Sequence, residues 1–343
     1  MSSCDITCDL YFRLFYEIFD NLGLVKMSIS RKERILVIKH GALGDLVQGF
    51  DAFAALRAGR PQAHIALLTS PIFADLTRLM PWFDEILVDT RSSPLNLIAA
   101  YRVRAILRDD WQFIVDMQCS RRTARYHRHF APKASRWFGT AKGASDPFPD
   151  FTGVNNNRRM LTAAKMAGGI EVASDDVDFS WLTPAGRSVI AGLDPAVRGG
   201  AVLIPGCSPA KPEKKWPVER FAALAAQLHE SGEQVVVVGT NSDRATTDAL
   251  LAQAPFCRDL VGKTDLVGLA AVLRSASLVV GNDTGPLFLA ARLGAPSLMV
   301  MGPETNPDMS APTGARCCWL AADPIREVTD AAVFSAVRAV QAG

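Results

Sequence analysis

The sequence predicts an α/β protein with two parallel β-sheets, one in each half of the chain. Short strands rich in Ile, Val and Leu, without polar alternation, recur between helical patterns, which is typical of sheets covered by helices on both faces. This alternation starts near Arg34 and starts again near residue 200. The 343 residues suffice for two domains at about 150 residues each.

The composition excludes several classes of protein. A hydrophobic fraction of 49% and a charged fraction of 21% are those of an ordinary globular chain. A net charge of +2 argues against a dedicated nucleic-acid-binding protein. Charge-free stretches stay below the roughly 18 residues that a membrane-spanning helix needs. The 7 cysteines and 5 histidines lack metal-ligand spacing, so we expect reduced thiols, no protein-ligated metal and no cofactor.

Residues 1–33 form an extension that differs from the rest of the chain. The aromatic-rich segment from Leu10 to Phe19 could form an amphipathic helix on a membrane surface. It lacks the basic region and cleavage site of a secretory signal. The alternative, which we favour, is that the protein starts at Met27, directly before the first predicted strand.

The first predicted domain covers residues 34–178. Its apolar runs predict strands at 35–38, 64–69, 85–89 and 113–116. Helical patterns lie between them at 46–58, 71–80 and 94–108.

The second predicted domain covers residues 179–322, and its first part, 179–200, reads as a linker because it contains Pro184, Pro195 and a Gly pair. Strands are predicted at 201–204, 234–238, 278–280 and 297–301. Helices are predicted at 218–231, 243–252, 266–275 and 287–293, and a tail, 323–343, contains one more at 329–340. Two sheets in tandem predict a cleft at the carboxyl ends of their strands, where ligands bind.

The loop after the first strand is the first candidate site. Gly41 and Gly44 let the backbone approach a ligand closely, and the helix that follows offers free N–H groups to an anion. The G-x-x-G spacing fails the dinucleotide fingerprint, which disfavours a nicotinamide-dependent oxidoreductase. Asp45 either caps this helix or faces the cleft as a general base.

Two strand-to-helix loops of the second domain are further candidates. In residues 205–217, Ser208 and a lysine could hold phosphate oxygens, although a solvated basic loop is the alternative. In residues 281–286, Asp283 and Thr284 either cap a helix or bind a ligand beside its exposed amides. Since all three loops follow strands of the two sheets, capping alone explains them poorly.

A basic stretch and an asparagine run are less specific. Between Met117 and Ser145 there is no acidic residue, while Arg121 and Arg122 begin a series of cations. This stretch is either a solvated face or a surface for an anionic ligand. Asn155 to Arg158 could hydrogen-bond to a sugar or could cap a helix.

Together these residues resemble glycosyltransferase family 9, the ADP-heptose:lipopolysaccharide heptosyltransferases. The resemblance runs in order from about residue 34 to the end of the chain. The segments that carry it are 35–45, 114–118, 214–221, 260–265 and 280–286. The G-x-x-G-D and G-N-D-T-G-P elements are specific as a pair.

The resemblance implies a GT-B fold, with two Rossmann-like domains facing a cleft and a carboxyl-terminal helix packed back on the first domain. It implies inverting transfer of a heptose or related sugar from an ADP-activated donor to a lipopolysaccharide-core or other glycolipid acceptor. Such an enzyme would be cytoplasmic, in peripheral contact with the inner membrane and without a nucleic-acid partner.

The resemblance also assigns roles to residues. Asp45 would be the base, Lys214 would neutralise the donor diphosphate, and Ser208 would lie beside it. Three residues, Asp283, Thr284 and Gly285, would hold ribose and phosphates. Gly239 and Asp243 would lie near the adenosine. The acceptor would contact Gly41, Gly44, Arg121 and Arg122.

One residue departs from the family pattern. The family usually has His at the fourth position of G-P-M-H, where this chain has Phe288. A phenyl ring cannot donate a hydrogen bond to phosphate. The alternative function is therefore a catalytically impaired nucleotide-sugar-binding protein on the same scaffold.

Overall fold

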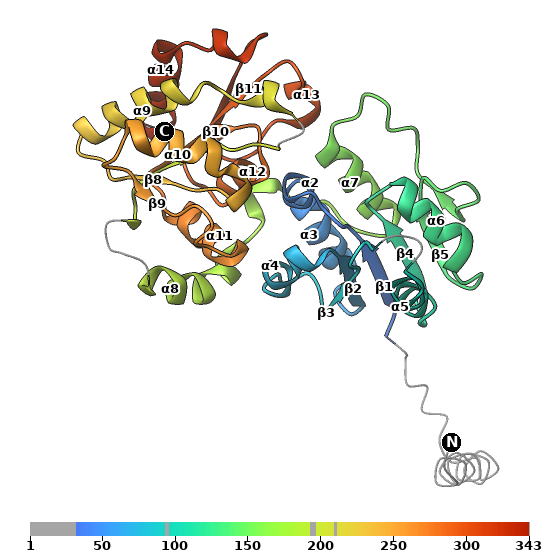
Figure 1. The fold of residues 1–343 in the computed structure, drawn as a ribbon. Coiled ribbons are helices and arrows are strands. Elements are labelled where there is room, and N and C mark those ends of the chain that lie inside the picture. The colour runs from blue at the N-terminus through green and yellow to red at the C-terminus, as the bar shows by residue number, and fades with distance from the viewer. Residues whose placement is uncertain (1–31, 93–95, 193–196, 209–210, 343) are drawn as a thin grey trace, which may run out of the picture. The chain divides into compact units, whose positions relative to one another are not determined.

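The computed structural model describes residues 32–92, 96–192, 197–208 and 211–342 (Figure 1). By its internal contacts the chain divides into residues 1–33 and residues 34–343, and only the second unit is described below. Both interpretations of the amino-terminal segment concern residues that lie almost wholly outside the described ranges.

The first sheet contains six parallel strands in the order β3-β2-β1-β4-β5-β6. The strands are β1 (Arg34–Ile38), β2 (His64–Thr69), β3 (Glu85–Val88), β4 (Phe113–Asp116), β5 (Arg136–Gly139) and β6 (Asp146–Pro147). The helices are α2 (Leu43–Val47), α3 (Phe50–Gly59), α4 (Ala74–Arg78), α5 (Leu97–Leu107), α6 (Arg121–Phe130) and α7 (Asn156–Met166).

The central strand β1 shows why the strands of this sheet are unbroken apolar runs in the sequence. Ile35 and Val37 join one hydrophobic cluster, while Leu36 and Ile38 join another on the opposite face. All four side chains are fully buried. A strand covered by helices on both faces has no solvent side on which polar residues could alternate.

The second sheet repeats this architecture with six parallel strands in the order β12-β11-β10-β7-β8-β9. The strands are β7 (Ala201–Ile204), β8 (Val235–Val237), β9 (Arg258–Asp259), β10 (Leu278–Asn282), β11 (Ser297–Met301) and β12 (Cys317–Ala321). The helices are α8 (Thr183–Gly192), α9 (Val218–Glu230), α10 (Arg244–Gln253), α11 (Leu266–Ser275), α12 (Gly285–Arg292), α13 (Pro307–Ser310) and α14 (Asp330–Ala342).

The predicted strands agree with the structure, but several helices differ. The helix expected at 46–58 is two helices, α2 and α3, and the segment 179–200 contains α8, which packs on α11, instead of being only a linker. The sequence pattern also missed α6, α7 and α13 and the strands β5, β6, β9 and β12. Helix α6 buries only Thr123 and Tyr126 and is otherwise basic, so it has no apolar periodicity.

The expectation that the carboxyl-terminal helix packs on the first domain is wrong. Helix α14 packs on β11, β12 and α9 of the second half (Figure 1). Val333, Val337 and Val340 lie on one face of the helix and join the hydrophobic cluster on the outer face of the second sheet. Burying this apolar stripe there accounts for its position.

The two halves meet between α2 and α12. A Cβ at Gly285 would lie 2.6 Å from Cβ of Leu43 and 2.9 Å from the amide nitrogen of Gly44. A Cβ at Gly44 would lie 3.2 Å from the ring of Phe288. Both glycines therefore permit a backbone approach that a larger residue would prevent. One hydrophobic cluster runs through this contact from the first sheet to the second.

A buried ion pair joins the halves beside this contact. Arg292 of α12 binds Asp51 of α3, and each side chain is only 5% exposed. Asp51 also accepts hydrogen bonds from Asn157 Nδ2 and Ser174 Oγ, both at 2.9 Å. Arg292 donates a further bond to the Ser174 carbonyl at 3.0 Å. Both charges are thus paired and hydrogen-bonded, as burial requires.

No helix in the described part of the chain is both long and apolar enough to cross a lipid bilayer.

Replacing Arg292 with Met should destabilise the protein by about 3 to 5 kcal/mol, because Asp51 would be left buried without its cation. Asp51→Asn in the same chain should restore part of this loss. Urea unfolding of Arg292→Met, Asp51→Asn and the double variant measures these changes in the free energy of unfolding.

The exposed pair Arg78–Asp75 is the matched control. Arg78→Met should cost less than about 1 kcal/mol, because exposed ion pairs contribute little. An equal cost for the two arginine substitutions would contradict the structural role of the buried pair.

Candidate active site

The first cavity lies where the strand order of the first sheet reverses. Strand β1 lies between β2 and β4, so the connections from β1 and β4 leave the sheet in opposite directions at their carboxyl ends. A cavity of about 320 Å³ opens there. Its lining includes Lys39 and Asp45 after β1, Met117 to Cys119 after β4, and Met309 and Ser310 from the second half.

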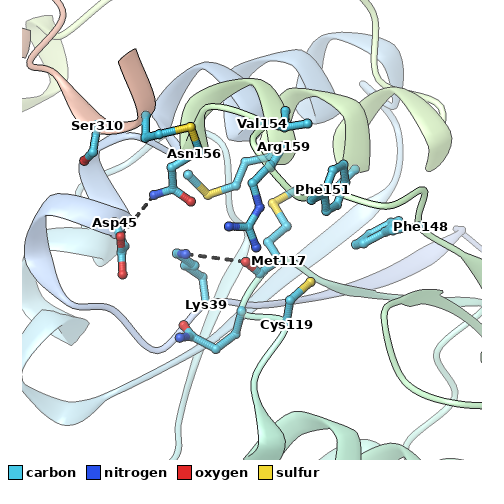
Figure 2. A pocket seen from close by; sticks show the side chains of 14 residues that line it. Lys39, Asp45, Met117, Cys119, Phe148, Phe151, Val154, Asn156, Arg159 and Ser310 are labelled. Atoms are coloured by element: carbon cyan, nitrogen blue, oxygen red, sulfur yellow. Dashed lines mark hydrogen bonds between the residues drawn. The ribbon is translucent and has the colours of Figure 1, made fainter. Parts of the chain in front are cut away.

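Asp45 is held by an asparagine that is distant in the sequence. Asn156, at the first turn of α7, donates from Nδ2 to Asp45 Oδ1 at 3.0 Å across 111 residues (Figure 2). Among the described residues, Oδ2 of Asp45 has no hydrogen-bond donor. Asp45 lies in the first turn of α2, but the cap position is Ala42. The carboxylate therefore lines the cavity instead of capping the helix.

Two cations line the same cavity. Lys39 is 3% exposed, and its Nζ donates to the Met117 carbonyl at 3.4 Å (Figure 2). Burial lowers the pKa of the Lys39 ammonium, and the Asp45 carboxylate partly offsets that effect. Arg159 of α7 reaches the cavity beside Phe151, with its guanidinium carbon 5.4 Å from the ring centre. The site combines one accessible carboxylate with two positive groups.

Asp116, at the end of β4, supports the floor of this cavity. It is 1% exposed, and its Oδ1 accepts from the amides of Gln118 at 3.1 Å and Cys119 at 3.0 Å. Burial raises the pKa of Asp116 to about 6, against the opposing effect of these hydrogen bonds. Burial also raises the pKa of the Cys119 thiol to about 11, so this thiol is protonated at neutral pH.

The second cavity, of about 520 Å³, lies largely at the carboxyl ends of the second sheet. Four of the predicted donor-binding residues line it, namely Ser208, Gly239, Asp243 and Thr284. Leu43, Ile72 and Phe73 of the first half complete its wall. Residues from both halves of the chain therefore line this cavity.

Thr284 lines this cavity, but its hydroxyl oxygen is buried. It precedes α12 at the cap position, yet its side chain makes no capping bond. Among the described residues its buried Oγ1 has no hydrogen-bond partner. A buried polar atom without a partner is costly. In the first turn of α12, the Leu287 and Phe288 amides donate to the Thr284 carbonyl at 3.1 and 3.4 Å, and Pro286 has no N–H. The Gly285 amide, at the positive end of the helix dipole, is the one that favours an anion.

The neighbouring charged residues form a cluster. The Asp283 carboxylate accepts from Lys214 Nζ and from Thr305 Oγ1, and Lys214 also donates to Thr305 Oγ1 at 2.8 Å. Asn282 joins the two loops, because its Oδ1 accepts from the Trp216 amide at 2.9 Å and its Nδ2 donates to the Pro205 carbonyl at 2.8 Å. Lys214 and Asp283 are thus brought together, beside Thr284.

Asp243 also lines the second cavity. Its Oδ2 accepts from the Thr240 amide at 2.8 Å and from the Thr240 hydroxyl at 2.7 Å. A Cβ at Gly206 would overlap the Asp243 carboxyl group, so glycine permits this approach. Gly239 also lies directly beside Asp243.

The start of α2 separates the two cavities. Leu43 lines the second cavity, whereas Asp45, two positions further on, lines the first. Two cavities are therefore lined by residues only two positions apart in α2.

Comparisons with known proteins agree with this geometry. The profile described as glycosyltransferase family 9 (heptosyltransferase) matches residues 154–329, about half of the chain. The chain belongs to glycosyltransferase family 9. It is therefore a glycosyltransferase.

Named relatives are similar over most of their length. The chain is 25% identical to lipopolysaccharide heptosyltransferase 2 of Salmonella typhimurium over 307 residues, which is 81% of this chain and 85% of the relative. It is also 25% identical to lipooligosaccharide heptosyltransferase 2 of Haemophilus ducreyi over 302 residues, 81% of this chain and 86% of the relative.

Solved structures show the same fold. The E. coli ADP-heptose lps heptosyltransferase II superposes with a TM-score of 0.73 at 22% identity, covering 90% of this chain and 98% of that one. The E. coli heptosyltransferase WaaC with ADP gives 0.73 at 19% identity, covering 90% and 99%. The GT-B prediction, with two Rossmann-like domains whose parallel sheets face a cleft, is confirmed.

In this family 9 enzyme, none of the four predicted acceptor residues, Gly41, Gly44, Arg121 and Arg122, lines the first cavity. Gly41 has φ +107°, a conformation that favours glycine, and Gly44 lies where a Cβ would be 3.2 Å from the Phe288 ring. Arg121 is exposed at the start of α6. Arg122 donates to the carbonyls of Arg91 at 3.0 Å and Ser92 at 3.2 Å, outside the lining of the cavity around Asp45.

The sequence pattern missed the residues that surround Asp45. Lys39 lies in the recognised first segment, but a lysine after a strand carries no specific signal. Asn156 was considered only as part of a run that could bind a sugar or cap a helix. The structure shows that Asn155 caps α7, accepting from the Asn157 amide at 2.9 Å, while Asn156 binds Asp45. Within the described ranges, no three His, Cys, Asp or Glu residues gather as metal ligands would.

Asp116 should make folding stability depend on pH. Its pKa of about 6 in the folded protein exceeds the ordinary value of 3.8, so the unfolded chain releases this proton first as pH rises. The contribution of Asp116 is therefore full below about pH 4 and falls by on the order of 2 to 3 kcal/mol up to about pH 7.

Urea unfolding of wild type and Asp116→Asn at these two pH values measures this effect. Wild type should lose stability relative to the variant as pH rises. The exposed Asp176→Asn variant is the control. If the difference in unfolding free energy between wild type and Asp116→Asn is the same at both pH values, the assignment is contradicted.

Proposed function

We propose that this protein transfers a heptose from ADP-heptose to a lipopolysaccharide-core acceptor, with inversion at the anomeric carbon. The observation that carries the proposal is the pair of cavities on either side of α2, with Asp45 in one and Thr284 in the other. The names of the relatives support the donor and the acceptor class.

The donor would occupy the second cavity. Its diphosphate would lie at the start of α12, near the unpaired Thr284 hydroxyl, the Gly285 amide and Ser208, with Lys214 and Asp283 adjacent. The adenosine would extend toward Gly239 and Asp243. Amides and cations placed in advance stabilise the charge that develops on a departing ADP.

The acceptor would occupy the first cavity, with a hydroxyl beside Asp45. The Asp45 carboxylate takes the proton of that hydroxyl as the oxygen attacks C1 of the heptose from the face opposite the diphosphate. The new glycosidic bond forms as the C1–O bond to ADP breaks, which inverts the configuration at C1. Asn156 positions Asp45 by fixing Oδ1, so that Oδ2 is directed to the acceptor.

Lys39 and Arg159 favour an anionic acceptor. Both line the first cavity with Asp45, and cations beside the reacting hydroxyl would bind carboxylate or phosphate groups of the acceptor. Arg121 and Arg122 would contribute a second, more distant positive surface. A glycolipid acceptor would place the enzyme at the cytoplasmic face of the inner membrane.

Phe288 favours a second candidate, a nucleotide-sugar-binding protein with impaired catalysis. Its ring is buried at the contact between α2 and α12, 5% exposed, and cannot donate to the donor phosphate. Thr284, Ser208 and Lys214 supply hydrogen-bond donors near that position, which is why we favour the enzyme. Binding of ADP-heptose without turnover would favour the second candidate.

Asp45→Asn should lower kcat for transfer by about 100- to 10,000-fold, because an amide of the same shape cannot accept the acceptor proton. Affinity for ADP-heptose should change less than about threefold, since Asp45 lies outside the donor cavity. Release of ADP in the presence of acceptor, with calorimetric titration of the donor, measures both quantities.

Two further variants make the result specific. Asn156→Ala keeps the Asp45 carboxylate but removes the hydrogen bond that orients it. The kcat should therefore fall by about tenfold, while the affinity for ADP-heptose stays unchanged. The exposed Asp175→Asn should behave as wild type. Full activity of Asp45→Asn would show that Asp45 is not the base.

A further inference from the structure

Helix α5 exposes an apolar face. Leu97, Ile98 and Tyr101 are 78%, 69% and 68% exposed, although side chains of this size are mostly buried in globular proteins. They lie at positions i, i+1 and i+4, so they share one side of the first turns of the helix. The opposite side holds the buried Val103 and Leu107.

The adjacent helix α6 exposes a positive face. Arg121, Arg125 and Arg128 are exposed at positions i, i+4 and i+7, whereas Thr123 and Tyr126 are buried. No ion pair involving these three arginines is formed among the described residues. The stretch from Met117 to Ser145 contains no acidic residue that could neutralise them.

The two helices pack against each other (Figure 1). A groove is lined by residues of both. It forms a cavity of about 250 Å³. Its apolar wall comes from Ala99, Ala100 and Val103 of α5 and from Phe130 of α6, and Arg125 also lines it. Arg122, His129 and Asp89 line it as well, and the Asp89 carboxylate is already bound to His40 and Tyr126. The groove therefore combines aliphatic and aromatic surface with two guanidinium groups.

This face lies at the same edge of the first sheet as Asp45. Helix α5 follows β3 and α6 follows β4, so both start at the carboxyl ends of parallel strands, as the loop carrying Asp45 does after β1. The apolar residues of α5 and Arg121 of α6 belong to these first turns.

We propose that the face formed by Leu97, Ile98 and Tyr101 of α5 and Arg121, Arg125 and Arg128 of α6 docks on an anionic lipid bilayer. Apolar side chains beside a row of arginines match an interface in which acyl chains lie under negatively charged headgroups. The complementary charge selects a bilayer over a second copy of this chain, whose same face would carry the same positive charge.

This inference deepens the proposed function, on which its purpose rests. A lipid-anchored acceptor can reach Asp45 without leaving the membrane if the docking face and the first cavity open at one edge of the sheet. Docking itself does not require transfer, so the two can be tested separately.

Co-sedimentation with vesicles tests the docking. Wild type should bind vesicles of phosphatidylglycerol and phosphatidylcholine at about 1:2 at least about tenfold better than phosphatidylcholine alone. Leu97→Ser with Ile98→Ser, and separately Arg125→Ser with Arg128→Ser, should each reduce binding to the anionic vesicles about tenfold. Raising NaCl from about 50 mM to about 500 mM should weaken wild-type binding through screening.

Matched controls replace similar residues elsewhere. Ile170, 55% exposed, and the exposed Arg258 lie outside this face, so Ile170→Ser and Arg258→Ser should bind vesicles as wild type does. Thermal unfolding of every variant verifies that it is folded. Equal binding of wild type to both vesicle types, or equal binding of the docking-face variants and wild type, would overturn the proposal.

Two readouts separate docking from transfer. The Leu97→Ser, Ile98→Ser variant should keep wild-type rates with an acceptor fragment that lacks acyl chains, and should lose rate only with acceptor embedded in vesicles. Vesicle binding without any transfer would reject the proposed function but leave docking intact. A concentration-dependent dimer that this variant abolishes, with no vesicle binding, would assign the face to a second copy instead.

Discussion

The buried contact between Asp51 and Arg292 is the constraint on which the rest of the site depends. It ties α3 of the first half to α12 of the second, and both side chains are almost fully buried. The same carboxylate binds Asn157, whose neighbour Asn156 binds Asp45. One charged group therefore fixes the junction of the halves and the first turn of α7, which in turn orients Asp45.

This constraint divides the chemistry between two cavities that share a short wall. The start of α2 presents Leu43 to one cavity and Asp45 to the other, and glycines at 44 and 285 let α12 approach that wall. A carboxylate and two cations line the first cavity, while Ser208, Asp243 and Thr284 line the second. Groups placed in advance around developing charge are what catalysis of transfer requires.

The sequence was informative where a local pattern determines the structure. Apolar strands, the loops that follow them and the grouping of Ser208, Gly239, Asp243 and Thr284 around one cavity agree with expectation, because parallel strands end at one edge of a sheet. Asn156 could not be assigned, since its bond to Asp45 spans 111 residues. The position of α14 was predicted wrongly because an apolar stripe shows that a helix packs, but not on which sheet.

The central claim is that the donor nucleotide and Asp45 occupy different cavities on either side of α2. A crystal structure of the protein with ADP alone tests it most directly. The account predicts ADP between Asp243 and the start of α12, with the β-phosphate near Thr284 and the first cavity free of nucleotide. ADP bound beside Asp45, or in the groove between α5 and α6, would contradict it.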